Sequence, residues 1–356
     1  MSTVKIPIGP QHPALKEPVN FTVEVDGEQV VDAKVRIGYN HRGIEKAAEL
    51  RTYVRDIYLL ERVCGICSHS HMLWLGVAGH EIGFDTLLHY TWRDREIVMD
   101  LLEAISGNRV NYAMNTIGGV RRDISKETIP TIKKGMQILR ERMQYYLQVC
   151  INEPTILKRA QGVGILPPEV ARKLGAVGPT LRASGINMDC RKDDPNAAYG
   201  EVPFDVITWD SCDVFGRVAV RVLETIQSCN MIEWMVDHLP KDDIRLKLKR
   251  RVPEGEVVSK YEAPRGELIH YIKANGSDKP ERVKIRTPTL ANWPSVEYML
   301  KNQYIADVPI IIAAIDPCLS CTDRITFVDT EKEKTWTMNS ESLRRYGIEF
   351  YEKKRW

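Results

Sequence analysis

The sequence predicts a mainly helical α+β protein with small β elements near both ends of the chain. Three observations support this fold class. Apolar and polar residues alternate on both sides of Asp26-Gly27, which is the pattern of two paired strands. From Gly43 to about residue 250, apolar residues recur three and four positions apart, as they do on helices. Strand-like stretches return after residue 250.

The N-terminal strands are predicted in residues 1–42. The segments "NFTVEV" and "EQVVDAKVRI" alternate apolar and polar residues and flank Asp26-Gly27. An Asp-Gly pair between two such segments is a strong signal for a tight hairpin turn, because glycine adopts the positive φ that this turn requires. We therefore expect a β-hairpin here.

The helical part is predicted over residues 43–250. A helical period begins in "IEKAAELRTYVRDIYLLERV" and runs directly into a cysteine pair. Further helices are predicted at about 86–114, 126–150 and 212–239, the last of them long and largely buried. The segment 190–208 is rich in Asp, Asn, Pro and Gly and predicts a surface loop.

A mixed C-terminal part is predicted over residues 251–356. Residues 256–276 predict two strands that turn around Pro264 to Gly266. The apolar run "VPIIIAAI" (308–315) predicts a buried strand that leads into a second cysteine pair. Because no linker separates the two cysteine pairs, we expect one domain over residues 1–356.

Composition excludes several classes of protein. With 43% hydrophobic and 28% charged residues, the chain is typical of soluble globular proteins. A net charge of +2 does not indicate a protein that binds nucleic acid. No signal peptide and no membrane-spanning segment is expected, so any membrane association would come through partner subunits.

Four of the eight cysteines form two CxxC pairs, Cys64 with Cys67 and Cys318 with Cys321. In a reducing compartment such pairs bind metal or perform redox chemistry more often than they form structural disulfides. Structural zinc is the commonest such tetrad, but its pairs usually lie close in sequence. Iron–sulfur and thioredoxin-like alternatives lack their usual spacing or βαβ context. The other cysteines have no ligand spacing and are expected to be small buried apolar side chains; they are Cys150, Cys190, Cys212 and Cys229.

The two cysteine motifs also carry a family resemblance. "RVCGIC" and "DPCLSCTDR" resemble the metal-binding motifs of nickel–iron hydrogenase large subunits. "GPQHPALKEP", "YNHRGIEK", "SGNRVNY", "GGVRRDI", "GAVGPTLRASG" and "YEAPRGELIHY" resemble the energy-converting, membrane-bound branch of the Ech type. That branch is related to the quinone-site subunit of complex I, which lacks both cysteine pairs. The resemblance implies the central long-helix bundle of these large subunits.

The resemblance implies a Ni–Fe(CN)2(CO) centre and the reversible reaction of H2 to two protons and two electrons. Cys64 and Cys318 would be terminal ligands of nickel, and Cys67 and Cys321 would bridge nickel and iron. The thiolate of Cys318 would take the proton. A metal-bound thiolate is a base of modest strength, which suits a reversible transfer.

Two acidic residues are candidates by the same resemblance. Glu17, in "HPALKEP", resembles a proton-gate glutamate beside the terminal cysteine; the alternative is an exposed acid paired with Lys16. Glu45, in "HRGIEK", resembles a ligand of a magnesium ion; the alternative is a neighbour of Lys46 or Glu49 on a wet helix face.

Residues around the second motif resemble groups that surround the bimetallic site. Arg265 would overhang it and offset the charge of thiolates and cyanides, unless it only stabilises a surface turn. Asp316 and Pro317 would orient the second cysteine loop, and Thr289 would donate to a cyanide. His71, like His69, lies close after the first pair and is expected as a hydrogen-bond donor beside the ligands.

The resemblance also implies partners. Because no further cysteine set could hold an iron–sulfur cluster, the electrons would pass to a small iron–sulfur hydrogenase subunit and a ferredoxin-like subunit. Ferredoxin would be the electron donor, and antiporter-like membrane subunits would couple the reaction to ion translocation. The chain would lie peripherally on the cytoplasmic side of the cell membrane.

The sequence departs from the family pattern at two places. Arg324 stands where many members carry a histidine before a C-terminal peptide that is clipped during maturation. His71 passes almost directly to "MLWLG", where relatives carry a further helical stretch. A scaffold that binds zinc and a complex I-like subunit without metal therefore stay open as alternatives to a hydrogenase.

Overall fold

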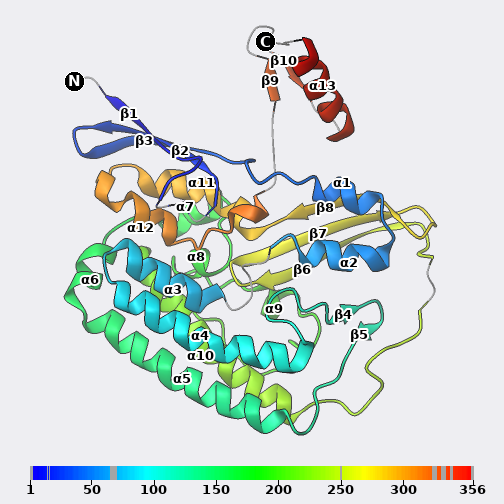
Figure 1. Cartoon of the computed structure of the whole chain (residues 1–356). Helices are drawn as coiled ribbons and strands as arrows, with labels where there is room; N and C mark the ends of the chain where they lie inside the picture. Colours follow the sequence, from blue (N-terminus) through cyan, green and yellow to red (C-terminus); the bar gives the residue numbers. More distant parts are fainter. Residues whose placement is uncertain are drawn as a thin grey trace.

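The computed structural model describes residues 3–13, 15, 17–64, 70–248, 251–322, 327–329, 334–336 and 340–353. Long helices form the lower part of the molecule in Figure 1, and two three-stranded sheets lie above them. The fold is α+β, as predicted.

The N-terminal sheet consists of β1 (Val4–Ile8), β2 (Asn20–Asp26) and β3 (Gln29–Arg36), all antiparallel and in that order. The predicted hairpin is confirmed: β2 and β3 pair around Asp26-Gly27, and Gly27 has φ +63°. Alternate residues of β2, Phe21, Val23 and Val25, are buried in the main core. The strand β1 was not predicted.

The main core lies among the long helices α3 (Ser70–Glu81), α4 (Asp85–Ser106), α5 (Ile129–Asn152) and α10 (Val214–Asp237). The helix α10 packs on α5, and α4 packs on α3 and α5. The helix predicted at about 86–114 ends earlier than expected. The helix α4 stops at Gly107, whose φ of +81° gives a left-handed cap.

The predicted helix over 44–63 is two helices, α1 (Ile44–Glu49) and α2 (Tyr53–Glu61). The extended backbone of Thr52 begins α2 and separates it from α1. This break turns the chain so that α1 packs on the C-terminal sheet, while the end of α2 leads to Cys64.

The C-terminal sheet consists of β6 (Gly255–Ala263), β7 (Gly266–Ala274) and β8 (Pro280–Arg286), antiparallel and in that order. The predicted strand pair and its turn at Pro264-Arg265 are confirmed; the third strand was not predicted. The buried helix α11 (Pro288–Leu300) follows directly.

The predicted strand at 308–315 is wrong. Residues Val308–Ala313 form a buried helix, α12, with Pro309 in its first turn. The three isoleucines 310–312 are all buried, so both faces of the segment lie in the core. A short apolar run cannot distinguish a buried strand from a buried helix by periodicity, because neither has a polar face.

The predicted surface loop at 190–208 begins instead with a short helix, α9 (Cys190–Asp193), whose first residue is buried.

The remaining elements are β4 (Asn115–Thr116), β5 (Gly119–Val120), α6 (Pro154–Ala160), α7 (Pro168–Lys173), α8 (Pro179–Arg182), the 3-10 turns Ile305–Asp307 and Leu319–Cys321, β9 (Phe327–Asp329), β10 (Lys334–Trp336) and α13 (Ser340–Lys353).

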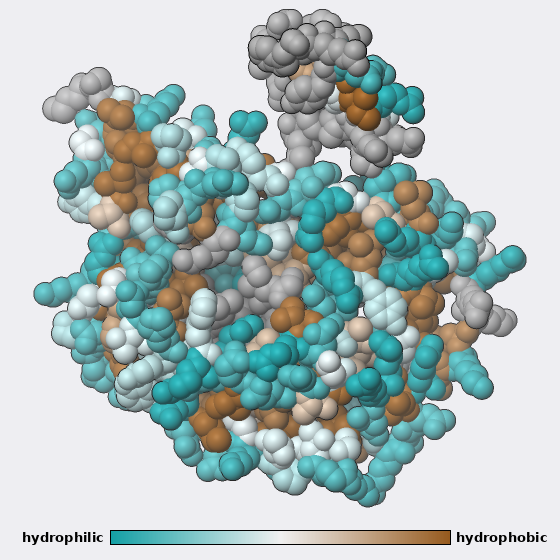
Figure 2. Space-filling view, in the orientation of Figure 1, coloured by the Kyte–Doolittle hydropathy of each residue, from teal (hydrophilic) through white to brown (hydrophobic). Residues whose placement is uncertain are grey.

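The surface in Figure 2 is mostly hydrophilic, with small separate apolar patches. Within the described ranges, no helix combines the length and the apolar character that crossing a bilayer requires.

Candidate metal centre

The fold brings together cysteines from distant parts of the chain. The Sγ atoms of Cys64 and Cys318 lie 2.9 Å apart, and those of Cys318 and Cys321 lie 2.8 Å apart. Cys318 and Cys321 are buried and Cys64 is partly buried. Over the residues that the structure describes, this is the only group of three or more potential ligands within 4.8 Å of one another. Cys67 and His69 lie outside the described residues, as does the side chain of His71.

These sulfur positions fit metal ligation. Sγ of Cys318 lies within hydrogen-bonding distance of the other two sulfurs, and all three sulfurs lie within 4.8 Å of one another. Metal–thiolate bonds are about 2.3 Å long, so ligands of one ion lie within twice that distance of each other. The donor set therefore suits soft or borderline metals such as nickel, iron or zinc.

Arg42 ties the two cysteine loops together. Its guanidinium donates hydrogen bonds to the carbonyl oxygens of Arg62 and Val63 at 3.1 and 2.7 Å, just before Cys64. It also donates to the carbonyl oxygen of Ser320 at 3.0 Å, between the two cysteines of the second pair. The sequence analysis missed this role, although Arg42 lies inside the quoted "YNHRGIEK" segment.

The second cysteine loop is held by threonines of the segment that opens α11. The backbone N–H of Cys318 donates to Oγ1 of Thr289 at 3.2 Å, and Oγ1 of Thr287 donates to the carbonyl oxygen of Cys321 at 2.8 Å. Both threonines are buried. The hydroxyl oxygen of Thr289 thus accepts a bond from the cysteine backbone in this structure.

Arg265 lies in the turn between β6 and β7 and is only 2% exposed, which excludes the alternative of a surface arginine. Its NH2 donates to Oδ1 of Asp316 at 2.7 Å, and its Nε donates to the carbonyl oxygen of Asp316. Asp316 has φ +55°, a left-handed conformation two residues before Cys318. The salt bridge therefore fixes both the arginine and the start of the cysteine loop.

A cavity of about 440 Å³ opens beside these groups. Its polar lining includes Cys64, Cys318, Cys321, Arg265, Thr289 and His270. Burial lowers the pKa of His270 below its ordinary value. The rest of the lining is largely apolar, so charges in this cavity are poorly screened by water.

Glu17 lies at the second cysteine loop. Its Oε2 accepts a hydrogen bond from the backbone N–H of Ser320 at 3.0 Å. The hydroxyl of Ser320 lies 3.4 Å from Sγ of Cys318. The Glu17 carboxylate is thus held at the residue whose hydroxyl contacts the thiol of Cys318. Lys16, its alternative partner, lies outside the described residues.

Glu45 lies on α1 and faces β8 instead of the cysteines. Its Oε1 accepts from the backbone N–H of Ile285 at 2.9 Å, and its Oε2 pairs with Nζ of Lys284 at 2.5 Å. Lys46 pairs with Glu49. The charge partner of Glu45 is therefore an ammonium group, and the described residues give no support for a magnesium ion there.

The scattered cysteines differ from the clustered ones. Cys150, Cys190 and Cys229 are buried, which fits the prediction of small apolar side chains. Burial raises the pKa of Cys150 to about 12 and that of Cys229 to about 11. These thiols stay protonated at neutral pH. Cys212 is only partly buried.

The sequence profile of the respiratory-chain NADH dehydrogenase 49 kDa subunit matches residues 81–250 and 247–324. These ranges cover more than half of the chain and include the second cysteine pair. The chain belongs to the 49 kDa subunit family.

Two relatives within this family differ in what their names describe. The membrane-bound hydrogenase subunit alpha of Pyrococcus furiosus is 40% identical over 386 residues, covering 94% of this chain and 90% of the relative. The NADH-quinone oxidoreductase subunit 4 of Thermus thermophilus is 32% identical, covering 89% of this chain and 93% of the relative. The 49 kDa family thus includes both hydrogenase and quinone oxidoreductase subunits.

The solved membrane-bound sulfane sulfur reductase, an archaeal respiratory membrane complex, contains a similar chain. It matches with a TM-score of 0.85 and 28% identity, over 90% of this chain and 98% of that one. The 49 kDa-type fold is therefore shared over most of the chain.

The alignment with the Pyrococcus relative spans 386 residues, whereas 94% of the 356 residues of this chain is about 335. About 50 aligned residues of the relative therefore have no counterpart in this chain. The further helical stretch that the sequence analysis expects in relatives after the position of His71 stays a prediction.

Proposed function

We propose that this chain is the catalytic subunit of a membrane-bound nickel–iron hydrogenase. The observation that carries the proposal is the meeting of Cys64, Cys318 and Cys321 in a cavity that the buried Arg265 also lines. Cys64, Cys67, Cys318 and Cys321 would hold a Ni–Fe(CN)2(CO) centre. When bound, this group supplies the redox-active, Lewis-acidic site for the reversible conversion of H2 to protons and electrons.

The protein's own residues provide the proton route. Sγ of Cys318 accepts a proton as the terminal thiolate base. The hydroxyl of Ser320 lies 3.4 Å from this sulfur, and Glu17 is held at the same residue by the backbone N–H of Ser320. The proton would pass from the thiol to this hydroxyl, and Glu17 would be the carboxylate that accepts it next.

Arg265 supplies the fixed positive charge. Thiolates and cyanides bring several negative charges into a largely apolar cavity, where screening is weak. The guanidinium offsets part of that charge, and its bonds to Asp316 keep it in place without reorganisation during the reaction.

The proposed function requires partner subunits. The electrons would pass through a small iron–sulfur subunit and a ferredoxin-like subunit, with ferredoxin as donor. Antiporter-like membrane subunits would couple the reaction to ion translocation, with this chain on their cytoplasmic side. The name of the Pyrococcus relative, a membrane-bound hydrogenase subunit, supports this assignment.

The test is the metal content of the anaerobically purified complex together with its infrared spectrum. We expect nickel and iron in equal amounts and bands in the cyanide and carbonyl stretching region. Cys64→Ser and Cys318→Ser should abolish hydrogen exchange, whereas Cys212→Ser, outside the site, should retain it. Zinc alone would indicate a scaffold subunit. No metal together with quinone-dependent activity would indicate a complex I-like subunit.

A further inference from the structure

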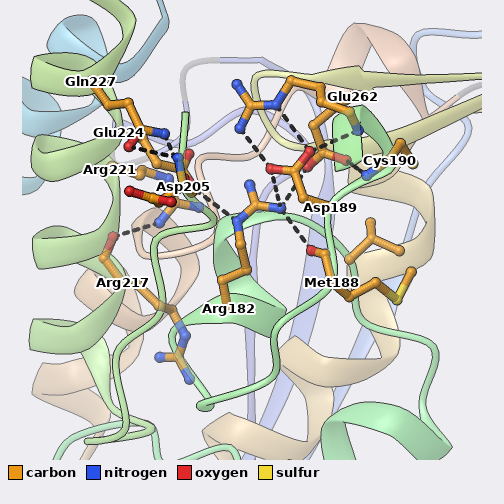
Figure 3. A network of polar contacts seen from close by, with 12 residues as sticks. Arg182, Met188, Asp189, Cys190, Asp205, Arg217, Arg221, Glu224, Gln227 and Glu262 are labelled. Carbon is orange, nitrogen blue, oxygen red and sulfur yellow. Dashed lines mark hydrogen bonds and ion pairs between the residues drawn. The ribbon is translucent and has the colours of Figure 1, made fainter. Parts of the chain in front are cut away.

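A buried network of ion pairs connects α8, α10 and β6 (Figure 3). Its centre is Arg182, at the end of α8, which is 1% exposed. Nε of Arg182 donates to Oε1 of Glu224 on α10 at 2.7 Å, and NH1 donates to Oε1 of Glu262 on β6 at 2.8 Å. A third carboxylate, Asp189, lies 3.4 Å from NH1. One guanidinium thus joins three separate segments of the chain.

The charges in this network depend on one another. Burial acts to lower the pKa of Arg182, but attraction to Glu224, Glu262 and Asp189 outweighs it and holds the pKa above the ordinary value. Arg182 therefore stays charged. Neutralising Glu262 would leave two carboxylates beside the guanidinium, but it would remove the ion pair that connects α8 to β6.

The other end of α8 contacts the same turn from the opposite side. Gly178, which precedes α8, lies so close to the turn that an added Cβ would come within 2.3 Å of Cα of Gly266 and 2.5 Å of the carbonyl oxygen of Arg265. Gly178 also has φ +66°, which favours glycine. The short helix therefore touches the β6–β7 turn at Gly178 and holds Glu262 through Arg182.

These two contacts bracket Arg265. Glu262 precedes it by three residues, and Gly266 follows it directly. The guanidinium of Arg265 is bonded to Asp316. The backbone of Arg265 is thus fixed from α8 and its head group from the second cysteine loop.

We propose that the Arg182–Glu262 ion pair is a positioning device that sets the place of Arg265 beside the cysteines. The proposal rests on the proposed hydrogenase function and adds residues that do not touch the metal site. A fixed cation acts on nearby charges only if its distance is held, and displacements near 1 Å change catalytic rates substantially. Weakening the pair should therefore change the environment of the site, and not only the stability of the fold.

The test compares Glu262→Gln with Glu267→Gln in the anaerobically purified complex. Glu262 and Glu267 are directly opposite each other in the β6–β7 pairing, but Glu267 pairs with Arg286 and not with Arg182. We expect Glu262→Gln to raise amide hydrogen exchange of residues 263–268 at least about tenfold and to shift the cyanide and carbonyl infrared bands. Glu267→Gln should do neither. Arg182→Lys, which cannot reproduce the forked bonds, provides a second variant with the same expectation.

Several outcomes would overturn the proposal. These are unchanged exchange at the turn in Glu262→Gln, an equal effect of Glu267→Gln, or faster exchange with unmoved infrared bands. If exchange rises in Glu262→Gln but the wild-type complex has no cyanide or carbonyl bands, the positioning of the turn is supported and the hydrogenase function is refuted. The amide exchange measurement thus distinguishes a failure of the positioning proposal from a failure of the proposed hydrogenase function.

Discussion

Arg265 and Asp316 are 51 residues apart in sequence and form a buried salt bridge at 2.7 Å beside the cysteine site. The arginine belongs to a strand turn and the aspartate to the loop that carries Cys318. The bridge therefore couples the turn that carries the positive charge of Arg265 to the loop that carries Cys318.

Replacing Arg265 tests this coupling. Arg265→Lys keeps the charge but loses the fork that holds the backbone carbonyl oxygen and Oδ1 of Asp316. We expect hydrogenase turnover to fall by about 10²–10³, the usual effect of losing one preorganised hydrogen-bond donor at an active site, with nickel and iron retained. Turnover and metal content are measured on the same preparation. Arg286→Lys, in the same sheet, is the control, and an equal loss there would contradict the specific role.

Arg42 is expected to hold the cysteine loops in register. Arg42→Ala removes three hydrogen bonds to carbonyl oxygens and should lower the free energy of unfolding by about 1–3 kcal/mol. Arg42 is exposed, and contact of these groups with water keeps the loss in this range. Metal content should fall as well, since the two loops supply ligands to one site. Thermal unfolding and metal analysis check both effects. Arg51→Ala, which loses a bond within its own helix region, should leave metal content unchanged.

Glu17 is expected to move protons without binding metal. Glu17→Gln keeps the shape of the side chain but removes the proton-accepting carboxylate, so turnover should fall by about 10²-fold or more. Metal content and the infrared bands should stay as in the wild type. In D2 exchange with water, the ratio of HD to H2 should change, because the proton leaves the site more slowly. Glu28→Gln, at an exposed turn, is the control; a loss of metal in Glu17→Gln would argue for a structural role instead.

Asp56 gives a prediction for pH dependence. It is 4% exposed, its two side-chain oxygens have no hydrogen-bond partner within the described residues, and burial raises its pKa from 3.8 to about 6, partly opposed by Arg51. The folded protein thus binds more protons than the unfolded chain between these values, so stability falls as pH rises from about 4 to about 6.

Asp56→Asn should remove this fall and be more stable than the wild type at pH 7, by about 2 kcal/mol. Unfolding by denaturant at pH 4, 5, 6 and 7 measures the difference between the two proteins. A difference that does not grow with pH would contradict the buried, unpaired carboxylate.

Sequence periodicity predicted the elements that have one polar face. The hairpin at Asp26-Gly27 alternates between core and solvent, the helices α4 and α5 each bury one face, and the β6–β7 pair is marked by its turn residues. Periodicity failed at residues 308–313, where a strand was predicted and the isoleucines are buried on every side. It also failed at the buried start of α9, where a surface loop was predicted. In both places tertiary packing decided the conformation.

By itself, the sequence determined the chemistry that this protein can use: two cysteine pairs with ligand spacing, a candidate acid at Glu17 and an arginine in a defined turn. Only the tertiary structure decided which of these groups meet. It placed Cys64 against Cys318, turned Glu45 toward Lys284, and showed that Arg42 and Arg182 hold the loops around the site. The physical reason is that spacing along the chain records local geometry, whereas contacts between distant segments depend on how helices and sheets pack.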